Sequence, residues 1–345
     1  PAGHDQFSYD LVIGALREYM PLDVLRMLGG QERLNMTLLA LNLSRYVNGV
    51  AKKHGEISKT MFPGYSIDSI TNGVHSYTWT CDSLKKLYDK YIPGWANDSF
   101  SLRYALSIPK EQIWQAHMEA KKRLIEYLNK ETNLGFEYDT FTIGFARRAA
   151  VYKRADLIFS DINRLIHISD NIGKIQLVFA GKAHPKDWPG KELIKRIFVN
   201  INQLRSQIKI VYLENYDIGL AKMLTSGVDL WLNTPQRPNE ASGTSGMKAA
   251  HNGIPNFSVL DGWWIEGCIE GVTGWPIGTK TTESTDNIKD DAQELYEKLE
   301  KVIVPMFYKN RDKWLEIMQH SIAINASFFN THRMVQQYVL NAYLY

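Results

Sequence analysis

The sequence predicts an α/β protein with a doubly wound parallel sheet, preceded by a helical segment. In the second half of the chain, short apolar runs alternate with stretches of helical pattern. Strands that alternate with helices are typical of βαβ units, and such units place a parallel sheet between two layers of helices. The predicted strands are TFTIGF (140–145), KIQLVFA (174–180), IKIVYL (208–213), VDLWLN (228–233) and IPNFSVL (254–260).

Helical patterns occupy much of the rest of the chain, because apolar residues recur there at helical spacing. A turn-rich joint interrupts them at residues 66–79, where the Asn72-Gly73 pair is the expected pivot. Pro109 is placed where a long helix should begin, since proline is favoured at a helix start. The predicted helical segments are residues 10–20, 35–58, 110–130 and 291–345.

Composition and charge exclude several classes of protein. The 345 residues carry a net charge of +3, which is too small to indicate nucleic acid as the main partner. No run of about 18 apolar residues is present, so no membrane association is expected, and no signal peptide is visible. The two cysteines, Cys81 and Cys268, lie far apart in the sequence, which fits a reducing, cytoplasmic location. Because the chain starts at Pro1 without a Met, we interpret it as part of a longer protein.

Three polar stretches follow predicted strands at the carboxyl edge of the sheet, where doubly wound sheets bind ligands. The first (146–156) is rich in basic residues, the second is GKAHP (181–185), and the third is a loop of small residues that enters a helix at 240–250. Backbone N–H groups, the helix dipole and basic side chains together bind anions, and phosphate suits this combination best. The basic residues of the first stretch are Arg147, Arg148, Lys153 and Arg154.

Each stretch alone also has a simpler structural explanation. Basic runs at helix starts are usually solvated, loops of Gly, Ser and Thr are usually turns, and a single lysine such as Lys248 is usually on the surface. The third loop is not a Walker A motif either, because GTSGMKAA lacks the required spacing of glycine and lysine. The anion site is favoured because all three stretches are expected at one edge of one sheet.

The third loop, EASGTSGMKAAHNG (240–253), resembles the signature of the α-glucan phosphorylases, which act on glycogen, starch or maltodextrin. Other blocks resemble that family in the family's order, and SVLDGWW and FFNTHRMVQQYV resemble its short microbial branch. The resemblance runs along the whole chain. It implies the C-terminal part of such an enzyme, with the helical tail of the first lobe and all of the Rossmann-like second lobe of a GT-B fold. The other blocks are RYVNGVAKKHGEIS, TNGVHSYTW, GFARRAAVYKRAD, FAGKAHP and YLENYDIGLAKML.

The resemblance implies three segments and one reaction. Residues 1–75 would end the first lobe, residues 76–325 would form the lobe that binds cofactor and phosphate, and residues 326–345 would pack back toward the first lobe. The implied reaction is reversible phosphorolysis, in which inorganic phosphate cleaves a terminal α-1,4-glucosidic bond and releases α-D-glucose 1-phosphate with retention of configuration. The expected partners are an α-1,4-glucan, inorganic phosphate, the N-terminal portion of the same enzyme and further copies in a homo-oligomer, and no metal is expected.

The family's cofactor is pyridoxal 5′-phosphate, and the resemblance implies that Lys248 carries it through a Schiff base that acts as a tether. Lys153 would bridge the cofactor phosphate and the substrate phosphate, and Arg148 would bind the inorganic phosphate, so these three are the implied catalytic residues. For Val47 and Trp79, packing in the core is an equally good interpretation. The other implied cofactor contacts are Thr244, Ser245, Arg147, Tyr216 and Trp79, and the implied sugar-pocket residues are Asn72, Val47, Glu240, Ala241, Ser242 and Gly243.

Two departures from the family limit these expectations, and two alternatives stay open. The family's glycine-rich helix start and a sugar-contacting histidine of the first lobe are absent, so the chain alone is expected to hold half a cleft and to turn over nothing. A nucleotide-sugar enzyme such as glycogen or starch synthase often carries a second acid eight residues after the first, where this chain has Lys248 after Glu240. The other alternative is a non-catalytic carbohydrate-binding fragment.

Overall fold

The computed structural model describes residues 4–17, 19–278 and 288–344, so the predicted start at Pro1 lies outside them. In these residues, six parallel strands form one sheet in the order β10-β9-β8-β5-β6-β7. The chain builds outward from β5 to β7, then returns to the centre at β8 and builds outward to β10. The predicted parallel α/β sheet is therefore confirmed. Its strands are β5 (Phe141–Ala146), β6 (Ile175–Ala180), β7 (Lys209–Leu213), β8 (Leu230–Asn233), β9 (Asn256–Val259) and β10 (Gly274–Ile277).

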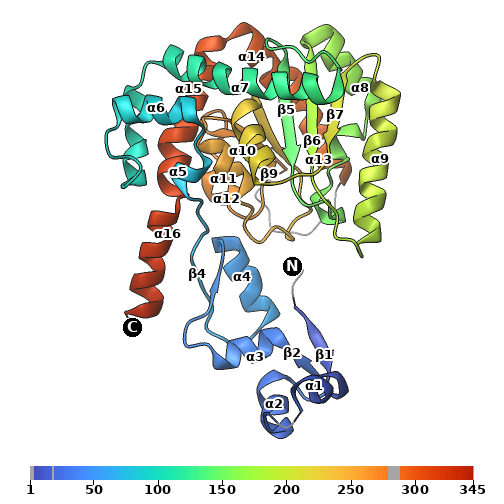
Figure 1. Cartoon of the computed structure of the whole chain (residues 1–345), viewed down its shortest axis with the longest axis vertical. Helices are drawn as coiled ribbons and strands as arrows, with labels where there is room; N and C mark the ends of the chain where they lie inside the picture. Colours follow the sequence, from blue (N-terminus) through green and yellow to red (C-terminus); the bar gives the residue numbers. More distant parts are fainter. Residues whose placement is uncertain (1–3, 18, 279–287, 345) are drawn as a thin grey trace.

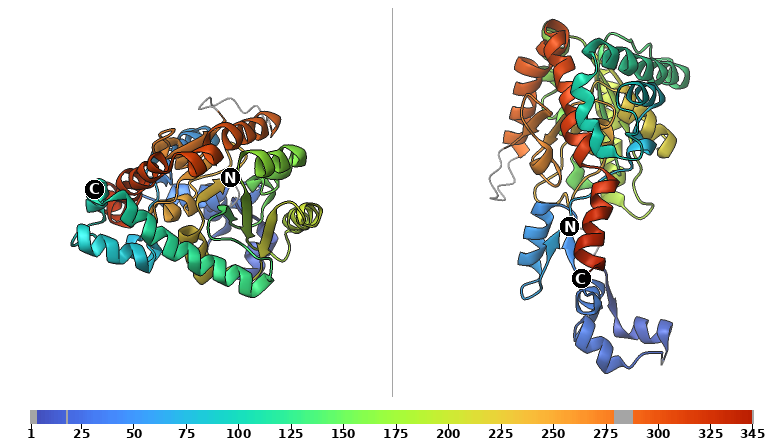
Figure 2. Two further views of the ribbon diagram at one scale, coloured as in Figure 1. Left: turned by 90° about the horizontal axis from the view of Figure 1, so that it is seen from above. Right: turned by 90° about the vertical axis from the view of Figure 1, so that its left-hand side faces the viewer.

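Both faces of this sheet are buried. Along β6, Leu177 and Phe179 join one core cluster, whereas Val178 and Ala180 join a second cluster on the opposite face. Helices cover each face, as Figures 1 and 2 show. The helices of this part are α5 (Ser76–Trp79), α6 (Asp82–Tyr91), the 3-10 helix η1 (Ser99–Ser107), α7 (Lys110–Thr132), α8 (Ile162–His167), α9 (Trp188–Leu204), α10 (Ile218–Gly227), α11 (Ser245–Ala250), α12 (Trp264–Gly267), α13 (Ile288–Lys298), α14 (Val304–Lys309), α15 (Arg311–His320), the wide π-type helix η6 (Ser321–Ala326) and α16 (Thr331–Tyr338).

Strand β10 was missed by the sequence analysis, because its four residues GWPI begin with glycine and contain a proline. Proline has no N–H to give to a neighbouring strand, so it is rare inside a sheet. Among the described strands, β10 lies at the edge of the sheet beside β9, where the missing donor costs little. The five other strands and the long helix after Pro109 are confirmed, with shifts of one or two residues at their ends.

The helix predicted over residues 35–58 is wrong in its middle. The structure has α3 (Met36–Leu43) and α4 (Lys52–Met61), and between them the short strand β3 (Asn48–Gly49) pairs in parallel with β4 (Asp68–Ser69). A Cβ atom on Gly49 would lie 2.4 Å from the backbone nitrogen of Gly55, so glycine is needed where β3 passes α4. The elements before α3 are β1 (Gln6–Ser8), α1 (Tyr9–Leu16), α2 (Leu22–Gly29) and β2 (Arg33–Asn35).

The C-terminal helix α16 runs away from the sheet and lies beside the segment that holds β3 and α4 (Figures 1 and 2). Arg333 Nη1 and Nη2 donate to the carbonyl oxygens of Thr71 and Asn72, the second at 3.0 Å. The Tyr338 hydroxyl accepts a hydrogen bond from Asn48 Nδ2 at 3.1 Å. These hydrogen bonds join α16 to β3 and to the joint predicted at residues 66–79.

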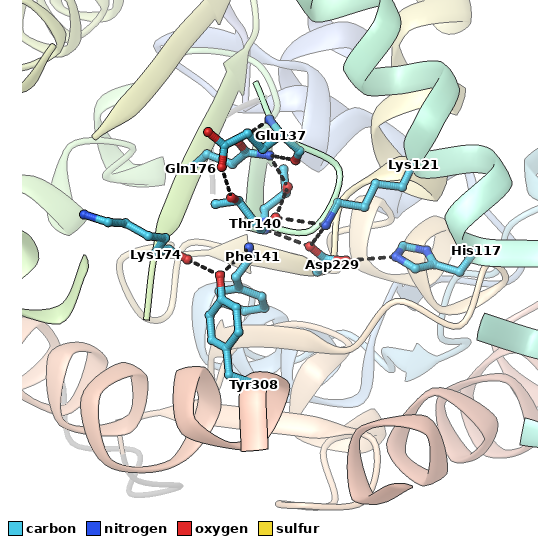
Figure 3. Close-up of polar contacts among 10 residues, drawn as sticks. His117, Lys121, Glu137, Thr140, Phe141, Lys174, Gln176, Asp229 and Tyr308 are labelled. Carbon is cyan, nitrogen blue, oxygen red and sulfur yellow. Dashed lines mark hydrogen bonds and ion pairs between the residues drawn. The ribbon is translucent and has the colours of Figure 1, made fainter. Parts of the chain in front are cut away.

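A buried network of ion pairs and hydrogen bonds connects α7 to the sheet (Figure 3). Asp229, just before β8, accepts hydrogen bonds from Lys121 Nζ at 2.6 Å, His117 Nε2 at 2.9 Å and the Thr142 backbone N–H at 2.8 Å. Burial alone would raise the pKa of Asp229, but the charge of Lys121 and the hydrogen bond from His117 hold that pKa below its ordinary value of 3.8. This network stands at the amino ends of β5 and β8, opposite the predicted ligand edge.

We expect Asp229→Asn to lower the free energy of unfolding by about 3–5 kcal/mol, because it leaves the fully buried Lys121 without its counter-charge. The exposed pair of Glu119 and Arg123 on α7 provides the control, and Glu119→Gln should change stability by less than about 0.5 kcal/mol. Urea unfolding at pH 7 measures both. Since the pKa of Asp229 is lowered on folding, its contribution is present above pH 3.8 and is lost as the pH falls further. Equal midpoints for the two variants would contradict this role.

Candidate active site

The strand order reverses between β5 and β8. Two of the three predicted polar stretches follow these strands, and the third, residues 181–185, follows β6. In doubly wound sheets, ligands bind outside the carboxyl ends of the strands where the strand order reverses. The loop after β5 carries residues 147–153, and the loop after β8 carries residues 234–244. In Figure 1 the carboxyl ends of the strands face the segment that holds α4.

The carboxylate of Glu240 joins these two loops. Its Oε2 atom accepts a hydrogen bond from Arg147 Nη2 at 2.7 Å and another from Lys153 Nζ. All three side chains are at most 10% exposed, so the ion pairs are protected from solvent. The structure therefore brings together a predicted sugar-pocket residue and two predicted phosphate-site residues.

The cluster of Glu240, Arg147 and Lys153 contains more positive than negative charge. Burial and the nearby charge of Arg147 lower the pKa of Lys153 from 10.5 to about 8, despite the contact with Glu240. Burial alone would raise the pKa of Glu240, but Arg147 and Lys153 lower it overall, so this acid is ionised at neutral pH. One carboxylate thus faces two buried cations.

Two of the guanidinium nitrogens of Arg147 lack a hydrogen-bond acceptor in the described part of the chain. Its Nε and Nη1 atoms are buried and have no hydrogen-bond partner among the described residues, and the same is true of Ser242 Oγ. An unpaired buried donor costs about 1–3 kcal/mol, and native proteins rarely leave one without a reason. Arg147, Glu240, Ser242 and Ser245 line a hollow of about 10 Å³ between the loops. This hollow has room for about one water molecule, so a larger ligand reaches the free donors only when the Glu240 side chain moves away from Arg147.

Lys248 lies on α11, which follows the small-residue loop. Gly243 has φ = +73°, and a Cβ atom on Gly246 would lie 2.3 Å from Asn256 Oδ1, so glycine is required at both positions. Lys248 Nζ lies 3.9 Å from the centroid of the Trp79 ring, and burial lowers the pKa of Lys248 below its ordinary value of 10.5. A larger fraction of this amine is therefore neutral and able to attack a carbonyl carbon.

Other predicted site residues lie around the contact of Glu240 with Arg147 and Lys153. Arg148 is exposed, and its charge acts to lower the pKa of Tyr152, which burial raises overall. Tyr216 is half-buried. Burial raises the pKa of its hydroxyl, and the nearby charge of Arg147 offsets part of that rise. Ser245 Oγ accepts a hydrogen bond from Trp231 Nε1 at 3.1 Å.

The predicted residues of the N-terminal part are held elsewhere. The backbone N–H of Asn72 donates to the Val50 carbonyl at 3.0 Å, and the Val47 carbonyl accepts from the Asp68 N–H at 2.9 Å. No hydrogen bond or ion pair in the described part of the chain joins Asn72 or Val47 to Glu240. Ala241 and Thr244 belong to the loop after β8 and are half-buried, and Thr244 directly precedes α11 without a side-chain capping hydrogen bond.

Asp261 was missed by the sequence analysis. It follows β9 at the same edge of the sheet, is 4% exposed, and accepts the backbone N–H groups of Glu240 and Gly262, each at 2.9 Å. Gly262 has φ = +55°, and a Cβ atom on it would lie 2.3 Å from the Ser242 carbonyl oxygen. That oxygen accepts the Trp263 N–H at 2.8 Å. This turn therefore positions the backbone that carries Glu240. Asp261 directly follows a predicted strand, in SVLDGWW, and this position in the sequence was the signal that could have identified it as a site residue.

We expect Asp261→Asn to remove a pH dependence from the stability of the protein. Burial raises the pKa of Asp261 from 3.8 to about 6, so the folded state binds its proton more tightly than the unfolded state. The contribution is present below pH 3.8 and is lost as the pH rises through 6, which amounts to about 3 kcal/mol at most.

Urea unfolding at pH 4 and pH 7 measures this effect. Wild type should lose more stability than Asp261→Asn between these two values, whereas the exposed control Asp82→Asn should follow wild type. Identical pH dependence in wild type and Asp261→Asn would contradict the assignment.

Comparisons with known proteins identify relatives that match most of this chain. The carbohydrate phosphorylase family model matches residues 15–302. The maltodextrin phosphorylase of Thermococcus litoralis is 42% identical to this chain, and the alignment covers 98% of the chain and 44% of that protein. The glycogen phosphorylase of Aquifex aeolicus is 38% identical over 90% of the chain and 50% of that protein, and that of Mycobacterium tuberculosis is 32% identical over 99% and 45%. The chain spans about half the length of these curated relatives.

In the described residues, no helix combines the length and the apolar character that crossing a bilayer requires. Within the same parts of the chain, no group of three or more His, Cys, Asp or Glu side chains is arranged to hold a metal ion.

Proposed function

Because the chain belongs to the carbohydrate phosphorylase family, we propose that it is the C-terminal catalytic portion of an α-glucan phosphorylase. The whole protein would cleave the terminal α-1,4-glucosidic bond of a glucan with inorganic phosphate and release α-D-glucose 1-phosphate with retention of configuration. Residues 76–325 would form the second lobe of a GT-B fold, with residues 1–75 and 326–345 attached to the first lobe. A homo-oligomer in the cytoplasm, as expected from the sequence, is part of the proposal.

One observation carries this proposal, namely the excess of buried donors around Glu240. Arg147 Nε and Nη1 and Ser242 Oγ have no partner in the described residues, and Lys153 adds a second buried cation beside them. Phosphate offers several acceptor oxygens and a negative charge, and Arg binds it through two parallel N–H groups. A neutral sugar would leave the charge of these cations unbalanced, so the cluster suits phosphate better than sugar alone.

The residues around Lys248 fit pyridoxal 5′-phosphate. The amine of Lys248 has a lowered pKa, the Trp79 ring lies beside it, and the loop that leads to it needs glycine at positions 243 and 246. We propose that Lys248 holds the cofactor covalently, that Thr244, Ser245 and Arg147 hold its phosphate, and that Tyr216 lies near it. When bound, the cofactor supplies a phosphate group that can donate and accept a proton beside the substrate phosphate.

The charges of the chain's own residues suggest how the substrates are held. Lys153, with a pKa of about 8, keeps its proton at neutral pH and can bind phosphate oxygens. Arg148 is exposed and can turn toward inorganic phosphate. As phosphate engages Arg147 and Lys153, it competes with Glu240 for them, and the released carboxylate can accept a hydroxyl hydrogen bond from the glucosyl unit. Asn72, Val47, Ala241, Ser242 and Gly243 would complete the sugar pocket.

We expect Arg148→Ala, in the protein completed with its N-terminal portion, to raise the KM for phosphate and to lower kcat. The loss in kcat/KM should be about 2–4 kcal/mol, because a charged partner of a desolvated anion is removed. Glu240→Gln should instead raise the KM for maltodextrin, because it removes a charged acceptor for a sugar hydroxyl. It should lower the KM for phosphate, because the carboxylate that competes for Arg147 and Lys153 is gone. Initial rates of glucose 1-phosphate formation measure both.

Two controls accompany this kinetic test. Arg123→Ala, on the exposed face of α7, should leave both constants unchanged, and the present chain without its N-terminal portion should form no glucose 1-phosphate. If Arg148→Ala left the phosphate dependence unchanged, Arg148 would be a solvated surface residue. If the completed protein formed no glucose 1-phosphate at all, the proposed function would be refuted.

A further inference from the structure

The short helix α5 carries the Trp79 ring that lies beside the amine of Lys248. Helix α5 has four residues, and a helix of about one turn is not stable by itself in water, so its position depends on contacts with other segments. Lys248 Nζ lies 3.9 Å from the centroid of the Trp79 ring, and among the described residues no hydrogen bond or ion pair fixes this amine. The position of α5 therefore decides what surrounds the amine.

The buried amide of Asn252 holds the end of α5. Asn252 Nδ2 donates to the Trp79 carbonyl at 2.7 Å, and Asn252 Oδ1 accepts from the Cys81 N–H at 2.8 Å. The amide thus pairs with the backbone on both sides of Thr80. The same Nδ2 atom also donates to the Lys248 carbonyl at 3.0 Å. One fully buried side chain therefore connects the backbone of Trp79 to the backbone of Lys248.

The neighbouring side chain of His251 holds the start of α5. His251 Nδ1 donates to the Met247 carbonyl at 2.8 Å, so its Nε2 atom accepts the hydrogen bond of the Ser76 hydroxyl at 2.9 Å. Burial lowers the pKa of His251 from 6.5 to about 4, so the ring is neutral at pH 7 and keeps this arrangement. Residues 251 and 252 thus attach both ends of α5 to the end of α11, and Figure 1 shows the two helices close together.

The Trp79 ring covers one side of the Lys248 amine. The face of an aromatic ring attracts a cation, which by itself favours the charged amine. Burial nevertheless lowers the pKa of Lys248 below its ordinary value of 10.5. Exclusion of water is therefore the larger effect, and it keeps more of the amine in the neutral form that attacks an aldehyde.

We propose that Asn252 is a positioning residue, which holds the Trp79 ring over the amine of Lys248 and so sets the reactivity of this amine toward an aldehyde. Asn252 acts at a distance from the reacting atoms, because its side-chain hydrogen bonds go to backbone atoms. That the aldehyde is pyridoxal 5′-phosphate rests on the proposed function. The positioning itself needs only residues of this chain.

Acetylation of Lys248 by acetic anhydride at a series of pH values tests the positioning without a cofactor. Only the neutral amine reacts, so the pH of half-maximal rate, followed by peptide mapping, reports the pKa of Lys248. This pH should lie below 10.5 in the wild type and should move up toward 10.5 in Asn252→Leu and in Trp79→Ala, because water then reaches the amine. The double variant should match Trp79→Ala, because Asn252 acts through the ring.

Labelling with pyridoxal 5′-phosphate and borohydride measures the consequence for the cofactor. Half-saturation at Lys248 should need about tenfold more cofactor in Asn252→Leu than in the wild type, because the amine is more often charged and less well aligned. Gln176→Leu is the matched control, because it replaces a fully buried amide at the amino end of β6, and it should change neither measurement.

A second variant covers the case in which Asn252→Leu does not fold. Asn252→Asp keeps an acceptor for the Cys81 N–H and loses the hydrogen bonds donated to the Trp79 and Lys248 carbonyls, so it should shift both measurements in the same direction.

Three results would overturn the positioning role. They are an unchanged pH of half-maximal acetylation in the Asn252 variants, a double variant that shifts further than Trp79→Ala, and equal shifts in Gln176→Leu, which would make Asn252 a residue that only supports the fold. If acetylation follows the expected pattern but pyridoxal 5′-phosphate never labels Lys248, the cofactor role in the proposed function is refuted and the positioning of Trp79 stands. The two proposals therefore fail separately.

Discussion

The contact of Glu240 with Arg147 and Lys153 holds the candidate site together. These side chains come from loops after β5 and β8, which are neighbours in the sheet but 87 to 93 residues apart in the chain. Without the carboxylate, two buried cations would face each other, and the loops would be driven apart. The Asp261 turn fixes the backbone of Glu240 from a third strand end. The site thus depends on one acid whose position the sheet topology determines.

This arrangement also explains why a phosphate would be accepted at a crowded, buried position. An anion that enters does not have to create a binding site, because Arg147 and Lys153 are already desolvated and Arg147 still has free donors. The desolvation penalty of these two cations already arises when the chain folds, and their ion pairs with Glu240 offset part of it. Under the proposed function, exchange of one anion for another would leave the local charge balanced and would release Glu240 toward the sugar.

Much of the fold could be predicted from the sequence, because five strands are continuous apolar runs and α7 has both a start signal and an apolar stripe. The rule that ligands bind at the carboxyl ends of parallel strands was enough to place Arg147, Lys153, Glu240 and Lys248 at one edge of the sheet. Features set by contacts between distant segments could not be predicted in this way. The break between α3 and α4 depends on the close passage of Gly49 and Gly55, and the edge position of β10 tolerates its proline. The contacts of Asp261 with Glu240 and of Asn252 with Trp79 likewise exist only after the chain has folded.

The central claim is that the donors around Glu240 bind a phosphate group beside the amine of Lys248. Borohydride reduction after incubation with pyridoxal 5′-phosphate or with pyridoxal, which has the same aldehyde but no phosphate, tests it directly. Peptide mapping gives the fraction of Lys248 labelled at each concentration. The account predicts labelling at Lys248, with half-saturation at about 100-fold lower concentration for the phosphorylated compound, as two charge-assisted hydrogen bonds would give. Equal half-saturation for the two aldehydes, or a label on Lys153 or Lys182 instead, would contradict it.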